Sequence, residues 1–325
     1  MVNQVRIAIL AIVVVIPLLS FGLWNMDSSA IIDESTSNSK IIAITSFFPL
    51  YDFTKQVGGE NVDVSLLVPQ GVEPHDWEPS IKDVQRIQNA DVVIINGIGF
   101  ENWVDKIDTI NSDVVLIDTS IGIEIITGYE DIHEDHTDEH EEDHTDEHED
   151  EIDEHTLEGD PHIWLNPVLA KIQVQNIADG LTRQDPSNEN YYQRNADNYK
   201  SQLDNLDSKI RNDLSSCSKE FLAFHQAFSY FADEYDLIQY SITQSTDPHG
   251  EPTAKKMQNL INLAQSLNIK VVFTEEAVDS RTSQIIANEF GAQTLVLSTL
   301  EVVEKGSSYI EKMEENLQNL KVALC

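Results

Sequence analysis

Short runs of valine and isoleucine alternate with helical segments along most of this chain, and this alternation restricts the fold more than any other feature. Several of the runs are continuously apolar, as expected for strands that are buried on both faces of a parallel sheet. We predict two series of such strands, at 41–46, 62–68, 91–96 and 114–118 and then at 221–225, 238–243, 271–275 and 294–298. The other elements are helices, predicted at 51–57, 81–89, 168–182, 228–235, 252–267, 282–290 and 307–324. The predicted fold class is α/β, with two mostly parallel sheets and covering helices.

A stretch without glycine or proline separates the two series. Between Glu189 and Ser216 apolar residues recur at steps of three and four, which predicts one helix about 40 Å long. Asp185-Pro186-Ser187 provides its start, with proline in the first-turn region. A helix of this length can join two lobes as a rigid strut, and an ordinary surface helix is the alternative.

These elements divide the chain into parts. We predict an N-terminal segment at 1–39, an N-terminal lobe at 40–185, a linker helix at 186–216 and a C-terminal lobe at 217–325. In a two-lobed α/β protein the ligand site is expected between the lobes, beside the carboxyl ends of the strands.

The N-terminal segment contains an uncharged apolar run. As a helix, residues 7–24 span roughly 27 Å, close to the thickness of the bilayer's hydrocarbon core. Arg6 precedes the run and acidic residues follow it, so the positive-inside rule predicts an extracytoplasmic location for the rest of the chain. The run is a cleaved signal peptide or an uncleaved membrane anchor, and its length favours the anchor. No cysteine follows it, which excludes a bacterial-type lipid attachment at this point.

Residues 130–158 form an acidic, histidine-rich segment in which the octet Glu-Asp-His-Thr-Asp-Glu-His-Glu occurs twice in succession. Its six histidines are His133, His136, His140, His144, His148 and His155. The segment has too few apolar residues to offset the entropy of folding. Neutral imidazole binds transition metals and carboxylates attract cations, so we interpret the segment as a mobile, auxiliary low-affinity metal-binding loop. A solvated acidic linker without a specific role is the alternative.

The formal net charge is −37, and no cluster of lysine or arginine is present. Nucleic acid is therefore not an expected partner. The chain has two cysteines, Cys217 and Cys325. In an oxidising compartment they can form one disulfide that closes a loop of about a hundred residues. Two free or buried thiols are the alternative.

Four histidines lie outside the acidic segment: His75, His162, His225 and His249. The first three occur at strand ends or in proline-stiffened turns, as in Glu-Pro-His75-Asp-Trp-Glu-Pro. Prolines on both sides restrict the backbone and preorganise the side chain. Three histidines so placed in an α/β chain that also has a histidine-rich segment favour a metal site.

Four motifs carry a family resemblance: Ile-Thr-Ser-Phe-Phe-Pro-Leu-Tyr-Asp-Phe, Val-Glu-Pro-His-Asp-Trp-Glu-Pro-Ser, Asp-Pro-His-Ile-Trp-Leu-Asn-Pro and Phe-His-Gln-Ala-Phe-Ser-Tyr-Phe-Ala. From residue 40 to about 322 the chain resembles the cluster A-I solute-binding proteins of ABC transporters for zinc and manganese. The resemblance implies two pseudo-symmetric lobes joined by a rigid helix, with the metal between them. By motif, the implied ligands are His75, His162 and His225. The histidine-rich insert resembles the loop of the zinc-specific branch.

The fourth ligand is less clearly indicated. The family uses an Asp, a Glu or a water at the last turn, and many relatives have Asp-Pro where Ser298-Thr299 stand here. We expect Glu301 to be the fourth ligand, with Glu275 as the alternative. The resemblance does not imply a ligand role for His249, which we interpret as a residue at the rim of the cleft.

Three imidazoles and one carboxylate suit tetrahedral Zn²⁺, whereas a Mn²⁺ site carries more oxygen ligands. Together with this donor set, the resemblance implies a non-enzymatic binding protein that captures Zn²⁺ and delivers it to an ABC permease, and we expect it to be a monomer. The rigid helix predicts small rotations of the lobes. The alternatives are binding of manganese or another divalent metal, or a surface adhesion or metal-buffering role. A zinc hydrolase with Glu275 or Glu276 as base is disfavoured because no His-Glu-x-x-His run occurs.

Overall fold

The computed structural model describes residues 40–69, 71–105, 114–127, 159–243, 252–276, 280–302 and 306–325. They belong to one compact unit, Lys40–Cys325. The apolar run 7–24, the acidic segment 130–158 and His249 lie outside the described residues. Among the helices of the described part, none has both the length and the apolar character that a membrane crossing requires.

The first sheet has four parallel strands in the order β2-β1-β3-β4. The strands are β1 (Ile41–Thr45), β2 (Val62–Leu66), β3 (Val92–Ile95) and β4 (Val115–Asp118). The accompanying helices are α2 (Phe48–Gly58), α3 (Ile81–Gln88) and α5 (Pro167–Gln184). All four residues of β3 are buried, as expected for a central strand covered on both faces.

The second sheet repeats this order as β6-β5-β7-β8, again with parallel pairing throughout. Its strands are β5 (Glu220–Ala223), β6 (Ile238–Ser241), β7 (Val271–Thr274) and β8 (Gln293–Val296). The accompanying helices are α7 (Ser229–Glu234), α8 (Ala254–Ser266), α9 (Arg281–Phe290) and α10 (Tyr309–Leu324). The shared strand order gives the two lobes their pseudo-symmetry, and the predicted α/β fold class is confirmed.

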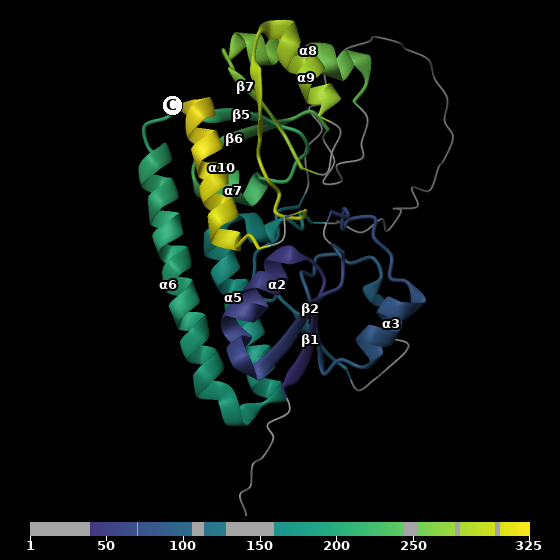
Figure 1. The fold of residues 1–325 in the computed structure, drawn as a ribbon. Helices are drawn as coiled ribbons and strands as arrows, with labels where there is room; N and C mark the ends of the chain where they lie inside the picture. Colours follow the sequence, from purple (N-terminus) through teal and green to yellow (C-terminus); the bar gives the residue numbers. More distant parts are fainter. Residues whose placement is uncertain are drawn as a thin grey trace, which may run out of the picture. The chain divides into compact units, whose positions relative to one another are not determined.

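Helix α6 (Glu189–Leu214) connects the two sheets and contacts α5, α2 and α10 (Figure 1). Its 26 residues extend over about 39 Å. The apolar stripe predicted from the sequence is buried, from Tyr192 at one end to Ile210 at the other. A single buried cluster contains this stripe together with residues of both sheets, such as Val92 and Phe273. The continuous core makes α6 a packed strut, and the lobe boundaries at 185 and 216 remain predictions.

The predicted elements occur in the predicted order, with small differences at their ends. Helix α2 begins at Phe48, three residues before the predicted start. Pro49 lies in its first turn, where a missing N–H removes no helical hydrogen bond. Strand β5 ends at Ala223, so that His225 lies beyond the sheet ladder. The strand ends before the predicted range does because the backbone leaves the hydrogen-bonded ladder after Ala223.

The predicted disulfide is confirmed. Cys217 and Cys325 are bonded, with their Cα atoms 4.7 Å apart. The backbone N–H of Ser218 also donates to the carbonyl of Leu324 at 3.0 Å. The bond therefore ties the end of α10 to the chain that follows α6.

Candidate metal centre

His75 lies in an irregular segment between β2 and α3, and its side chain is 11% exposed. Its backbone N–H donates to Oε1 of Glu73 at 3.0 Å, and its carbonyl accepts from Nδ2 of Asn102 at 3.4 Å. The ring packs edge-on against Phe100, with centroids 4.8 Å apart. These contacts help to position the imidazole, whose Nε2 lies 3.1 Å from Oε1 of Glu301 in the other lobe.

His162 precedes the short 3₁₀ helix η2 (Ile163–Leu165) and is fully buried. Its Nδ1 donates to Oδ1 of Asp160 at 2.7 Å, and its backbone N–H donates to the same oxygen at 3.0 Å. This pair of bonds fixes the orientation of the ring, so that Nε2 faces away from Asp160.

His225 follows β5 and is also fully buried. Its Nδ1 lies 2.7 Å from Oε2 and 2.8 Å from Oε1 of Glu275, which follows β7. Glu275 thus accepts a hydrogen bond from Nδ1 and leaves Nε2 directed towards His162, 3.2 Å from the Nε2 of that residue. Because β5 and β7 are neighbours in the sheet, the carboxyl ends of these strands bring the two residues together.

Glu301 lies in the turn after β8, and its side chain is 2% exposed. Leu300 before it is buried and has φ of 60°, a left-handed conformation that is strained for a leucine. Trp164 donates from Nε1 to the carbonyl of Thr299 at 2.7 Å. The contact joins this turn to η2, which directly follows His162.

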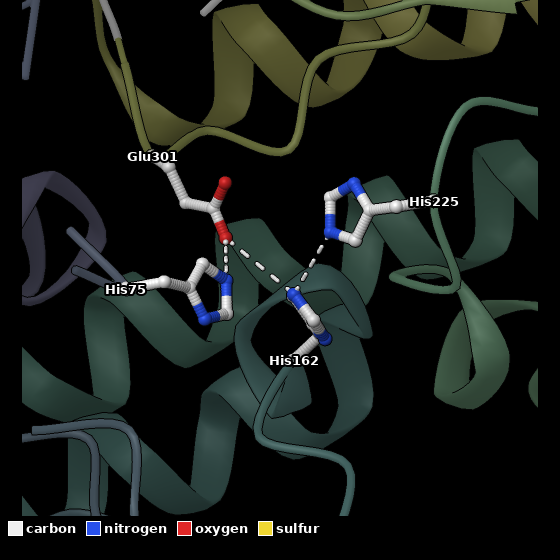
Figure 2. Close-up of side chains that lie close together, drawn as sticks. All are labelled: His75, His162, His225 and Glu301. Carbon is white, nitrogen blue, oxygen red and sulfur yellow. Dashed lines mark hydrogen bonds and ion pairs between the residues drawn. The ribbon is translucent and has the colours of Figure 1, made fainter. Parts of the chain in front are cut away.

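These four side chains converge on one point (Figure 2). One potential ligand atom from each lies within 4.8 Å of the other three. Nε2 of His75 is 3.1 Å and Nε2 of His162 is 3.5 Å from Oε1 of Glu301, while the Nε2 atoms of His162 and His225 are 3.2 Å apart. Distances of this size let one cation contact all four after a small adjustment.

The cluster carries strongly perturbed pKa values. Burial lowers the pKa of His162, but the carboxylates of Asp160 and Glu301 outweigh it and raise that pKa to about 10. Burial raises the pKa of Glu301, but His75 and His162 hold it well below the usual range of a carboxyl. At neutral pH His162 is therefore an imidazolium beside an ionised Glu301. The proton on its Nε2 must leave before that nitrogen binds a metal ion.

The sequence identified all four members of this cluster but not the side chains that orient them. Glu275, the alternative fourth ligand, contacts Nδ1 of His225 and lies on the side of the ring opposite to the cluster. Asp160 was not singled out, although its position two residues before a histidine in Asp-Pro-His is a usable signal. Thr299 and Trp164 had no such signal, because their contacts join residues 135 positions apart.

The structure has two α/β lobes, each built on a parallel sheet, and three imidazoles and one carboxylate converge between them. These features define the class of bilobal proteins with a buried site for a metal ion. The four ligand types suit a tetrahedral divalent cation. A family model described as "Zinc-uptake complex component A periplasmic" (ZnuA) matches residues 44–323. The chain belongs to this ZnuA family, which confirms the resemblance seen in its motifs.

Individual relatives agree with the family. The high-affinity zinc uptake system protein ZnuA of Bacillus subtilis (strain 168) is 39% identical, over 89% of each chain. The zinc-binding lipoprotein AdcA of Streptococcus pneumoniae (strain ATCC BAA-255 / R6) is 33% identical over 89% of this chain, which spans only 57% of that longer protein. The Zn(II)-bound ZnuA-like domain of S. pneumoniae AdcA superposes with a TM-score of 0.71 at 32% identity, covering 87% of this chain and 98% of that domain.

Proposed function

We propose that this chain is the extracytoplasmic binding protein of a zinc ABC transporter and that it captures Zn²⁺ with His75, His162, His225 and Glu301. The observation that carries the proposal is the convergence of these four ligand atoms within 4.8 Å at the lobe junction. Three of the four side chains are almost completely shielded from water, which suits tight and selective binding of a cation.

The donor set favours zinc over manganese. Three nitrogens and one oxygen match the tetrahedral preference of Zn²⁺, whereas Mn²⁺ prefers six oxygen-rich ligands. The relatives with zinc in their names support the same choice. Donor chemistry alone does not separate Zn²⁺ from Cu²⁺ or Ni²⁺, which bind imidazole at least as well.

The arrangement favours capture over catalysis. A catalytic zinc site keeps one position for water, whereas four protein side chains complete a tetrahedral shell. Glu275, a candidate base in a hydrolase, is hydrogen-bonded to Nδ1 of His225. In this position it raises the basicity of a ligand and does not face a substrate.

Delivery requires a membrane partner. We propose that the lobes at 40–185 and 217–325, held by the linker at 186–216, dock as a monomer on an ABC permease. The segment 7–24 anchors the chain to the membrane or is removed as a signal peptide. The segment 130–158 gathers Zn²⁺ weakly at its six histidines and raises the local concentration near the tight site.

Calorimetric titration with Zn²⁺ tests this function. We expect one tight site, with several weak sites in addition, because a buried four-ligand site is preorganised whereas the sequence of 130–158 has too few apolar residues to fold a preorganised site. Deletion of 130–158 should remove the weak sites and leave the tight site. A tight site that disappears with the deletion would contradict the proposal. Mn²⁺ is the control cation and should bind much more weakly than Zn²⁺.

Acid should weaken zinc binding. His162 is protonated below a pKa of about 10 in the metal-free protein, so each Zn²⁺ bound at pH 7 displaces at least one proton. Apparent affinity should then fall about ten-fold per pH unit and per proton displaced. Calorimetry at pH 7 in two buffers with different ionisation enthalpies measures the number of protons released, and a value of zero would exclude this competition.

His162 also makes the stability of the metal-free protein depend on pH. This stability should fall as the pH rises, whereas the affinity for zinc should increase. Because the pKa of His162 is raised on folding, its stabilising contribution is complete below the ordinary value near 6.5 and disappears as the pH rises towards 10. Zinc replaces the proton, so this loss should be absent from the zinc-loaded protein.

A further inference from the structure

The two oxygens of the Glu301 carboxylate have different neighbours. Oε1 lies 3.1 Å from Nε2 of His75 and 3.5 Å from Nε2 of His162. Oε2 accepts a 2.7 Å hydrogen bond from the hydroxyl of Thr299. Figure 2 shows one oxygen directed at the rings and the other turned away from them. Only one oxygen of this carboxylate is therefore presented to a cation.

The backbone that carries Thr299 is fixed on several sides. The indole N–H of Trp164 donates to the Thr299 carbonyl, and the N–H of Leu300 donates to Oγ of Ser298 at 3.2 Å. Asn316 bonds both backbone groups of Ser298, at 2.8 and 2.7 Å. These bonds hold the left-handed Leu300 in place, so the backbone that carries the Thr299 hydroxyl cannot shift to follow a rotating carboxylate.

Releasing Oε2 from this hydroxyl is unfavourable. Thr299 is only 4% exposed, so water does not readily replace the lost acceptor. Leaving a buried hydroxyl without its partner lowers the equilibrium constant for releasing Oε2 roughly ten-fold or more. A Glu301 that turns Oε2 from the hydroxyl towards the cation in order to become bidentate would incur this cost, whereas a monodentate one keeps the hydrogen bond.

We propose that Thr299 is a specificity-determining residue, which holds Glu301 in monodentate coordination and thereby favours four-coordinate Zn²⁺ over Mn²⁺. The inference rests on the proposed function of the four-residue site. Mn²⁺ needs additional oxygen ligands to approach six-coordination. The second oxygen of Glu301 is the nearest candidate within the cluster, and Thr299 withholds it.

Replacement of Thr299 by valine removes the hydroxyl and keeps the shape of the side chain. In the full-length T299V protein we expect the ratio of Zn²⁺ to Mn²⁺ affinity to fall about ten-fold, a typical effect of losing a hydrogen bond to a ligand. With one equivalent of Co²⁺ as the optical probe, the intense visible bands of four-coordination should weaken as a fifth ligand atom binds. T299S, which retains the hydroxyl, should restore both the ratio and the bands.

Thr54→Val is the matched control. Thr54 is buried in α2, and its hydroxyl has no hydrogen-bond partner among the described residues, so its loss should change neither readout. An equal loss of Zn²⁺ and Mn²⁺ affinity in T299V, with unchanged Co²⁺ bands, would overturn the specificity role. X-ray absorption of the wild-type protein with one equivalent of Zn²⁺ decides independently of any variant, because a bidentate carboxylate there would also overturn it.

Failure of this inference is distinguishable from failure of the proposed function. Wild-type protein without a tight Zn²⁺ site would refute the function and the inference together. A tight wild-type site with an unchanged Zn²⁺ to Mn²⁺ ratio in T299V would refute the role of Thr299 alone.

Discussion

Replacement of His162 by alanine should lower the affinity for Zn²⁺ by roughly 100- to 1,000-fold. Structural zinc sites with four ligands bind with about 10–16 kcal/mol in total, which is roughly 2.5–4 kcal/mol per ligand. His162 is the most central of the four, since its Nε2 lies 3.2 Å from that of His225 and 3.5 Å from Glu301. Competition with a chelator of known affinity measures the loss.

Asp160→Asn provides a graded comparison for this variant. It keeps all four ligands and removes only the charge that orients His162, so its effect should be smaller, about 10- to 100-fold. Thermal unfolding of each metal-free variant separates loss of a ligand from loss of the fold. Nanomolar binding that persists after His75→Ala plus His162→Ala would refute the assignment of the site.

Removal of the disulfide should destabilise the protein by about 3–5 kcal/mol, because a cross-link that closes a loop of about a hundred residues restricts the unfolded chain strongly. Cys217 and Cys325 are 108 positions apart. The double variant Cys217→Ser plus Cys325→Ser should therefore unfold at lower urea concentration, with a steeper transition because its less restricted unfolded chain exposes more surface.

Chemical reduction of the wild-type protein is the control for this variant and should reproduce its unfolding curve. Zinc affinity of the folded double variant should be unchanged, because the bond joins the end of α10 to the chain after α6 and touches none of the four site residues. Identical unfolding curves for oxidised and reduced wild-type protein would show that the bond contributes nothing to stability.

Much of the fold follows from local sequence patterns. Continuous apolar runs such as Val92–Ile95 predict buried parallel strands, and the apolar spacing in α6 predicts both its helical structure and its buried face. Such patterns are local because the periodicity of side chains along one element is set by that element's own backbone. Proline-flanked motifs likewise identified His75 and His162 as candidate ligands.

Local sequence patterns did not distinguish Glu275 from Glu301 as the carboxylate that joins the three histidines. Both are glutamates just after a strand of the second sheet, and the sequence favoured Glu301 only by resemblance. In the structure, Glu275 bonds the far nitrogen of His225, whereas Glu301 reaches His75, which lies 226 positions away. Neighbouring strands of one sheet thus direct two similar side chains to different histidines.

The sequence by itself determined the strands, the helices, the connecting helix and the histidines that face the lobe junction, because periodicity and proline-restricted turns act over a few residues. Only the tertiary structure decided which carboxylate joins the imidazoles and which ones orient them. It also decided that the hydroxyl of Thr299 holds one oxygen of Glu301, within a turn fixed by the indole of Trp164. Those choices depend on distances between residues far apart in the chain, which are fixed only when both lobes pack against α6.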